Sequence, residues 1–123
     1  MTIIAIAEIR LYSQSEGGIC NSIQGRILCP AFYHNDMDNG YSTFIIFENQ
    51  TFPGSYINTH ISLLMKDKAK QIFIKDNIFE FGSAKQIGIG KIIETINVSD
   101  EQMIELFHFD IWPGTAHIVQ REE

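Results

Sequence analysis

The chain has few of the features that export a protein, anchor it in a membrane or staple a small core. Its two cysteines, Cys20 and Cys29, form no Cys-x-x-Cys pair, so a cysteine-bound zinc is not expected. No apolar run approaches the roughly 20 residues of a membrane span, and the apolar start at 1–7 lacks the basic region of a signal peptide. We therefore expect a cytoplasmic protein with free thiols and no cofactor, although a hairpin disulfide is compatible with an oxidising compartment.

The sequence also lacks a recognisable catalytic constellation. It has no Ser-His-Asp arrangement and no assignable pair of catalytic carboxylates, and Gly88-Ile89-Gly90 lacks the third glycine and the following helix of a dinucleotide loop. His34, Asp36 and Asp38 share one side of an extended chain, but their spacing fails the calcium-loop register and favours a polar turn. We expect neither an enzyme nor a metal site.

What the chain contains is typical of an all-β domain. With 123 residues, 45% of them hydrophobic, it is long enough to bury one core. Its frequent Ile, Phe and Tyr suit a pleated, half-buried surface. Strand-like runs follow one another at close spacing, at 3–12, 26–33, 41–47, 57–65, 72–74, 78–81 and 86–96. The pattern predicts an all-β fold, a six- to eight-stranded antiparallel barrel with one short C-terminal helix.

Glycine and proline mark the corners of this expected barrel. The glycines of 15–18 follow the first strand, where the chain must turn sharply. Gly88 and Gly90 interrupt a strand pattern, which indicates that another part of the chain approaches closely there. Pro30 lies within the second run and indicates a sheet edge or a bulge.

The pattern changes to that of a helix after residue 97. Ser99 and Gln102 have the spacing of a capping box, and Val98 and Met103 that of a hydrophobic staple. Met103, Ile104 and Phe107 form an apolar stripe, and the helix must end before the proline at 113. We therefore divide the chain into a barrel at 1–96 and a helix with an acidic extension at 97–123, packed on the same domain.

The formal net charge of −6 is confined to the last quarter of the chain. Acidic and basic residues balance in 1–93, whereas from residue 94 Arg121 is the only base beside Glu94, Asp100, Glu101, Glu105, Asp110, Glu122 and Glu123. An acidic surface favours basic partners and repels nucleic acid. The competing interpretation is a solvated tail that only aids solubility.

Aromatic side chains accompany these acids, as they do at protein interfaces. We therefore predict a partner-binding surface from Glu101, Glu105, Phe107, Phe109, Asp110 and Trp112. The alternative is that Trp112 closes one end of the barrel.

Five short motifs occur in order between residues 5 and 95: Ala7-Glu8-Ile9-Arg10-Leu11-Tyr12-Ser13 with Ser15-Glu16-Gly17-Gly18, Pro30-Ala31-Phe32-Tyr33, Pro53-Gly54, Phe79-Glu80-Phe81 and Ile87-Gly88-Ile89-Gly90-Lys91-Ile92. In this order they resemble the third, C-terminal domain of bacterial elongation factor Tu, which is a β-barrel. The resemblance implies that fold for this chain, as a stand-alone domain.

The residues with which that family holds the T-arm of transfer RNA are not kept. Where the family has Arg and His after its paired glycines, this chain has Ile19 and Cys20, and Cys29 replaces the Arg before the strand proline. The turn at 82–85 keeps only Lys85 of a Glu-Gly-Gly-Arg turn. The resemblance therefore implies the scaffold without the RNA-reading surface.

These observations predict a non-catalytic protein-binding module. The first hypothesis is an acidic inhibitor or immunity-type protein that neutralises a basic partner such as a nuclease toxin. The alternative is a translation-associated accessory protein that mimics elongation factor Tu and binds RNA or a translation factor through Lys66, Lys68, Lys70 and Lys85. A third hypothesis is an enzyme or thiol sensor that uses Cys20 or Cys29.

Overall fold

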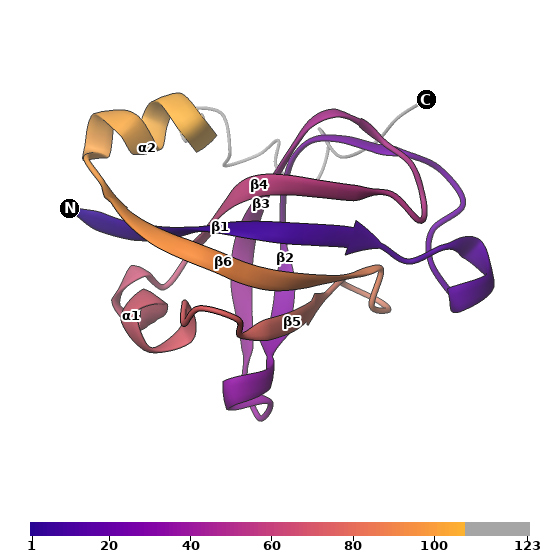
Figure 1. Cartoon of the computed structure of the whole chain (residues 1–123), viewed down its shortest axis with the longest axis horizontal. Coiled ribbons are helices and arrows are strands. Elements are labelled where there is room, and N and C mark those ends of the chain that lie inside the picture. The colour runs from indigo at the N-terminus through magenta and orange to yellow at the C-terminus, as the bar shows by residue number, and fades with distance from the viewer. Residues whose placement is uncertain (108–123) are drawn as a thin grey trace.

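The computed structural model describes residues 1–107, which form a closed antiparallel β-barrel (Figure 1). Its strands are β1 (Thr2–Leu11), β2 (Ile23–Tyr33), β3 (Gly40–Thr51), β4 (Tyr56–Leu63), β5 (Ile78–Phe81) and β6 (Gly88–Val98). The helices are α1 (Ala69–Ile72) and α2 (Asp100–Phe107), with single 3-10 turns η1 (Gln14–Glu16), η2 (His34–Asp36) and η3 (Lys66–Lys68). The predicted barrel with a short C-terminal helix is confirmed.

The strands follow one another around the barrel in the order β1-β4-β3-β2-β5-β6, and β6 closes the ring on β1. The ladder between β1 and β6 runs from Thr2 opposite Val98 to Leu11 opposite Gly88. Its register shifts between Ile6 and Ala7. Because side chains alternate along a strand, every second residue of β1 points into the barrel. Those residues, Ala5, Ala7, Ile9 and Leu11, are fully buried.

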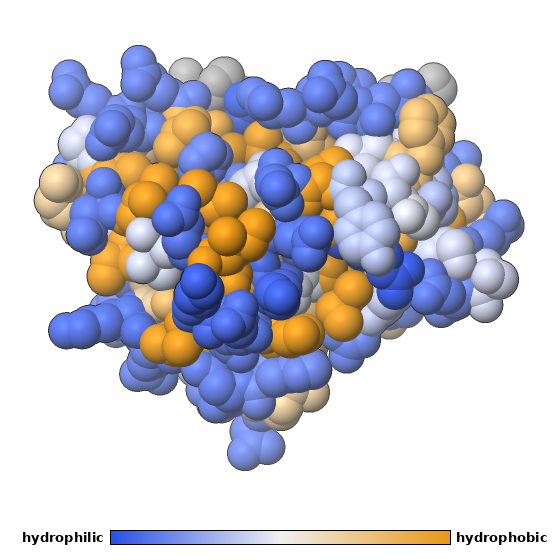
Figure 2. All heavy atoms as spheres, in the orientation of Figure 1, coloured by the Kyte–Doolittle hydropathy of each residue, from blue (hydrophilic) through white to orange (hydrophobic). Residues whose placement is uncertain are grey.

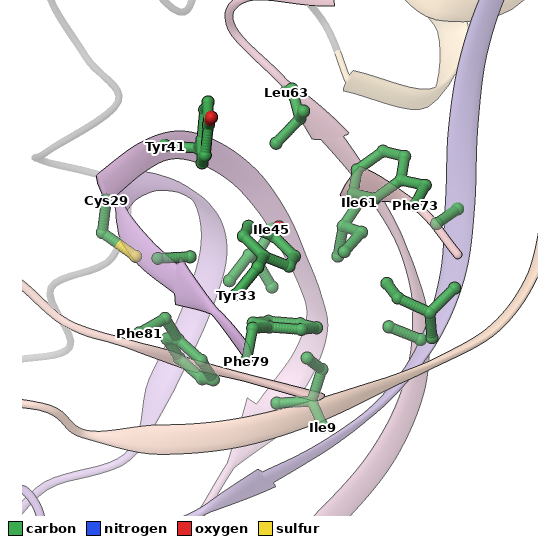
Figure 3. Close-up of a cluster of buried hydrophobic side chains, with 14 of the residues drawn as sticks. Ile9, Cys29, Tyr33, Tyr41, Ile45, Ile61, Leu63, Phe73, Phe79 and Phe81 are labelled. Atoms are coloured by element: carbon green, nitrogen blue, oxygen red, sulfur yellow. The ribbon is translucent and has the colours of Figure 1, made fainter. Parts of the chain in front are cut away.

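Aromatic and aliphatic side chains pack together in the barrel interior (Figure 3). The rings of Tyr33 and Phe79 lie 4.8 Å apart between their centroids, and Phe81 lies beside Phe79. The hydroxyl of Tyr33 is fully buried and forms a 3.0 Å hydrogen bond with the Thr43 hydroxyl, so its polar group is satisfied. The two cysteines, Cys20 and Cys29, are free.

The glycines of β6 give these rings their space. In the β5–β6 ladder, Phe81 is opposite Gly88 and Phe79 is opposite Gly90. A Cβ atom at Gly88 would come within 2.5 Å of the Phe81 ring, and one at Gly90 would overlap the Phe79 ring. The close approach predicted from the sequence is confirmed, with side chains of the neighbouring strand as the approaching groups.

The turn after β1 is stabilised by an ion pair. Arg10 and Glu16 bond at 2.8 Å, and the Ser13 amide donates a second hydrogen bond to the Glu16 carboxylate at 2.8 Å. Gly17 then adopts a left-handed conformation with a φ of 91°, which glycine reaches without steric cost. The sharp turn predicted at 15–18 is confirmed.

The strand predicted at 72–74 is wrong. Ile72 is the last residue of α1 and Phe73 follows it directly, and both are buried with Ala69 in the barrel core. This spacing of three and four residues is that of a helix face, but the helix is too short to show a repeating pattern.

Pro30 lies where β2 loses one of its two neighbours. On one side it pairs with Ser42 of β3, but on the other side β5 pairs only with the stretch Ala31–Tyr33. The Pro30 carbonyl accepts a 3.1 Å hydrogen bond from the Gly82 amide at the end of β5. The proline, which has no N–H to donate, therefore stands where the β2–β5 ladder ends, and not at an open edge, because the barrel is closed.

The strands β3 and β4 pair only at the ends away from their connecting turn and diverge toward it, and this divergence positions the candidate site. The two strands pair only from Thr43 opposite Leu63 to Ile45 opposite Ile61. Beyond that point β3 stays on β2 and β4 stays on β1. The hydroxyl of Thr59 bridges the gap with a 2.8 Å hydrogen bond to the Ile46 carbonyl.

Candidate functional site

The helix α2 begins at the predicted capping box. The Ser99 amide donates to the Gln102 side-chain oxygen at 2.8 Å, and the Gln102 amide donates to the Ser99 hydroxyl at 3.2 Å. These reciprocal bonds satisfy amides that the first turn of a helix leaves unpaired. Val98 and Met103 are both buried in one cluster, as the predicted staple requires.

The inner face of α2 is fixed to the outside of the barrel. Met103 and Phe107 are buried with Ile4 of β1, Phe44 and Ile46 of β3 and Val98 of β6. The rings of Phe44 and Phe107 lie 6.4 Å apart between centroids. Burial of two large side chains holds the short helix in place, since a helix of this length is marginal alone.

Phe107 was predicted as an aromatic anchor for a partner, and the structure corrects this. The side chain is 0% exposed, because its position on the helix directs it onto the barrel cluster. Ile104, predicted to share the apolar stripe, instead lies on the outer face and is 52% exposed. The apolar residue that α2 presents to solvent is therefore Ile104.

The outer face of α2 is acidic. Asp100, Glu101 and Glu105 are all exposed, and Glu101 and Glu105 stand one turn apart on either side of Ile104 along the helix. Figure 2 shows hydrophilic side chains over α2 at the upper left, with hydrophobic atoms between them. We call Glu101, Ile104 and Glu105 the acidic face. The other predicted members of this surface, Phe109, Asp110 and Trp112, lie outside the described residues.

A pocket of about 360 Å³ opens where β3 and β4 diverge, beside the last turn of α2. Its apolar wall is formed by Ile6, Ile46 and Leu106. Its charged and polar side chains come from β2, β3, β4 and α2, and include Arg26, Glu48, Asn58, His60 and Glu105. Of the predicted partner-binding residues, Glu105 belongs to both the acidic face and this pocket.

Arg26 connects the pocket to the helix. Its Nε donates a 3.4 Å hydrogen bond to the Leu106 carbonyl oxygen in the last turn of α2. This bond joins β2 to α2, in addition to the buried cluster that holds the helix on the barrel.

Sequence reasoning missed most of the pocket. In the sequence, Asn58 and His60 alternate with Ile57, Thr59 and Ile61, which indicates that the two polar residues share one face of β4. Arg26 and Glu48 stand at the borders of the apolar runs in β2 and β3, which was the available signal. Nothing local in the sequence shows that these side chains meet, because the β3–β4 divergence brings them together.

The lysines proposed for RNA contact do not form one surface. Lys66, Lys68 and Lys70 occupy η3 and the start of α1. Lys85 lies in the β5–β6 turn, where its Nζ donates a 3.2 Å hydrogen bond to the Gly18 carbonyl. Figure 1 shows these two turns at opposite ends of β5.

The other residues considered in the sequence analysis are the acids of the turn after β2 and the two cysteines. Asp36 accepts hydrogen bonds from Tyr41 at 2.5 Å and Asn39 at 3.0 Å within a polar turn. Within residues 1–107, no group of three His, Cys, Asp or Glu side chains is arranged to hold a metal ion. Burial raises the pKa of Cys29 to about 12, which makes a poor nucleophile of it, whereas Cys20 is exposed.

Comparison with known proteins identifies no relative: no protein-family model matches the chain, and a search of curated proteins finds no similar sequence. The resemblance to elongation factor Tu therefore stays a prediction. In the described part of the chain, no helix has the length and apolarity that crossing a membrane requires.

Proposed function

We propose that the protein is a non-catalytic protein-binding module whose acidic face binds a basic protein, in the manner of an inhibitor or immunity protein. The observation that carries the proposal is the two-sided character of α2. Its inner residues are locked onto the barrel, while Glu101 and Glu105 flank an exposed Ile104 on the outer side.

Such a surface has the chemistry of a protein interface. The apolar centre of such a surface is buried when a partner binds, and the charges around it favour a partner of opposite charge. Because capping bonds and core packing hold α2 in place, little conformational entropy is lost when a partner binds. The concentration of the net charge of −6 in this part of the sequence adds attraction for a basic partner.

The test is affinity purification of the tagged protein from nuclease-treated native cells, read by mass spectrometry. Removal of residues 97–123 is a poor variant, because it deletes Met103 and Phe107 from a buried cluster. The double substitution Glu101→Gln/Glu105→Gln removes two charges and leaves the core intact. Asp38→Asn/Asp67→Asn is the matched control, since both acids are exposed in turns away from α2.

The proposal predicts a stoichiometric basic protein that the control variant captures and the acidic-face variant loses. Capture should weaken with added salt, because screening shortens electrostatic range to about 8 Å at physiological ionic strength. Capture of the same proteins by both variants would overturn the assignment of the acidic face.

A second candidate is an RNA- or translation-factor-binding accessory. The clustering of Lys66, Lys68 and Lys70 in one exposed segment favours it. It predicts saturable binding of transfer RNA at ~150 mM salt, lost when all three lysines become Gln. The distance of Lys85 from this segment weighs against a single RNA-binding surface.

A further inference from the structure

The pocket beside α2 adjoins the acidic face and shares Glu105 with it. It lies between the diverging strands β3 and β4 and the last turn of α2. Its volume of about 360 Å³ is at the lower end of the range for ligand sites, which runs from roughly 300 to 1,000 Å³. A cavity of this size suits one long side chain better than a large ligand.

The charges around the pocket favour a cation. Among the described residues that line it, two carboxylates, Glu48 and Glu105, accompany one arginine, Arg26, and one histidine, His60. Arg26 directs its Nε to the Leu106 carbonyl, so part of its hydrogen-bonding capacity serves the helix end.

The remaining lining suits a long aliphatic stem. Ile6, Ile46 and Leu106 form an apolar wall, on which methylene groups can pack while a charged head reaches a carboxylate. Asn58 adds a side-chain amide beside these groups. Apolar wall and paired carboxylates together match a basic amino-acid side chain.

We propose that this pocket receives one arginine side chain of the basic partner, with its guanidinium between Glu48 and Glu105. This inference rests on the proposed function and names the anchor of the interface. Arginine fits better than lysine, because its planar fork donates to two carboxylates at once. Arginines seated in pockets are also frequent hot spots of protein interfaces.

The test uses three short capped peptides, Gly-Arg-Gly, Gly-Lys-Gly and Gly-citrulline-Gly, titrated into the full ¹⁵N-labelled chain. Citrulline keeps the shape of arginine without its charge. We expect the arginine peptide to shift the backbone amides of Asn58, Thr59 and His60 saturably, with millimolar affinity. The lysine peptide should bind more weakly, and the citrulline peptide should cause no saturable shift.

Variants assign the effect to the pocket. Glu48→Gln and Glu105→Gln should each weaken binding of the arginine peptide about tenfold, while the distant Asp38→Asn leaves it unchanged. Equal shifts from citrulline, or none from arginine, would overturn the inference. If the peptide fails but capture of a basic protein still depends on Glu101, the pocket assignment fails and the proposed function stands. If the peptide binds and no basic protein is captured, the pocket still binds an arginine side chain, but the proposed function fails.

Discussion

The ring of Phe79 lies over Gly90, its partner on the neighbouring strand, in the space that any larger residue would occupy. Phe81 and Gly88 repeat the arrangement one step along the same ladder. Each glycine lets an aromatic ring lie across the barrel interior, so the pairs act as one packing unit. The short strand β5 thereby supplies two of the largest buried side chains.

Replacing Gly90 with Ala should destabilise the protein by about 1–3 kcal/mol, the usual cost of overpacking a core. This exceeds the roughly 0.5–1 kcal/mol that alanine would gain over glycine in backbone entropy. Urea unfolding measures the difference, with the exposed Thr95→Ala on the same strand as the control. In the Gly90→Ala background, Phe79→Leu should cost less than it does alone, whereas additive effects would contradict the direct contact.

Replacing Ser99 with Ala should lower the free energy of unfolding, measured by urea denaturation, by about 0.5–2 kcal/mol, because the amide of Gln102 loses its acceptor.

Replacing Phe107 with Ala should lower the free energy of unfolding by about 3–5 kcal/mol, because it empties a fully buried site. The exposed Ile104→Ala should stay within about 0.5 kcal/mol of the wild type. A large loss at Ile104 with none at Phe107 would reverse the assigned orientation of α2.

Alkaline pH should destabilise the fold through Cys29. Burial raises the pKa of this thiol to about 12, above its ordinary value, so the unfolded chain loses the proton first. Stability is therefore fully present below about pH 9 and is lost as the pH rises toward 12, by up to about 1.4 kcal/mol per pH unit. Urea unfolding across this range should show a shallower loss for Cys29→Ala. Identical slopes would contradict burial of the thiol.

Glu16 should remain ionised in acid. A hydrogen bond from Arg10, then one from the Ser13 amide, lower the pKa of this carboxyl to about 2. The stabilising contribution is therefore present above the ordinary glutamate range and is lost as the pH falls through about 2. Carboxyl ¹³C shifts should show this, and Arg10→Gln should return the Glu16 pKa toward its usual value. A normal titration in the wild type would exclude the ion pair in solution.

Local patterns in the sequence predicted those parts of the fold that depend on neighbours in the chain. Ser99 and Gln102 are three residues apart, and the glycines of β6 interrupt a clear alternation, so both features are visible in the sequence. Ile72 and Phe73 were misassigned to a strand, because two consecutive apolar residues fit either a short strand or a single helical turn.

The candidate site was predictable only in part, because it depends on register. Glu105 was identified from its place on an acidic helix, but Arg26 and Glu48 come from other strands. They meet only because β3 and β4 separate after Ile45 and Ile61. Phe107 illustrates the same limit: an aromatic beside acids suggests an interface, but the direction of its side chain depends on which helix face meets the barrel.

The most direct test of the account is the dissociation constant of the captured basic partner for three forms of the full chain. These are the wild type, Glu101→Gln/Glu105→Gln and the charge-matched control Asp38→Asn/Asp67→Asn. We predict that the acidic-face variant binds at least about tenfold more weakly, a difference of ~1.4 kcal/mol, and that the control stays within about twofold of the wild type. Equal weakening by both variants would show that net charge alone attracts the partner, and would contradict a specific binding surface on α2.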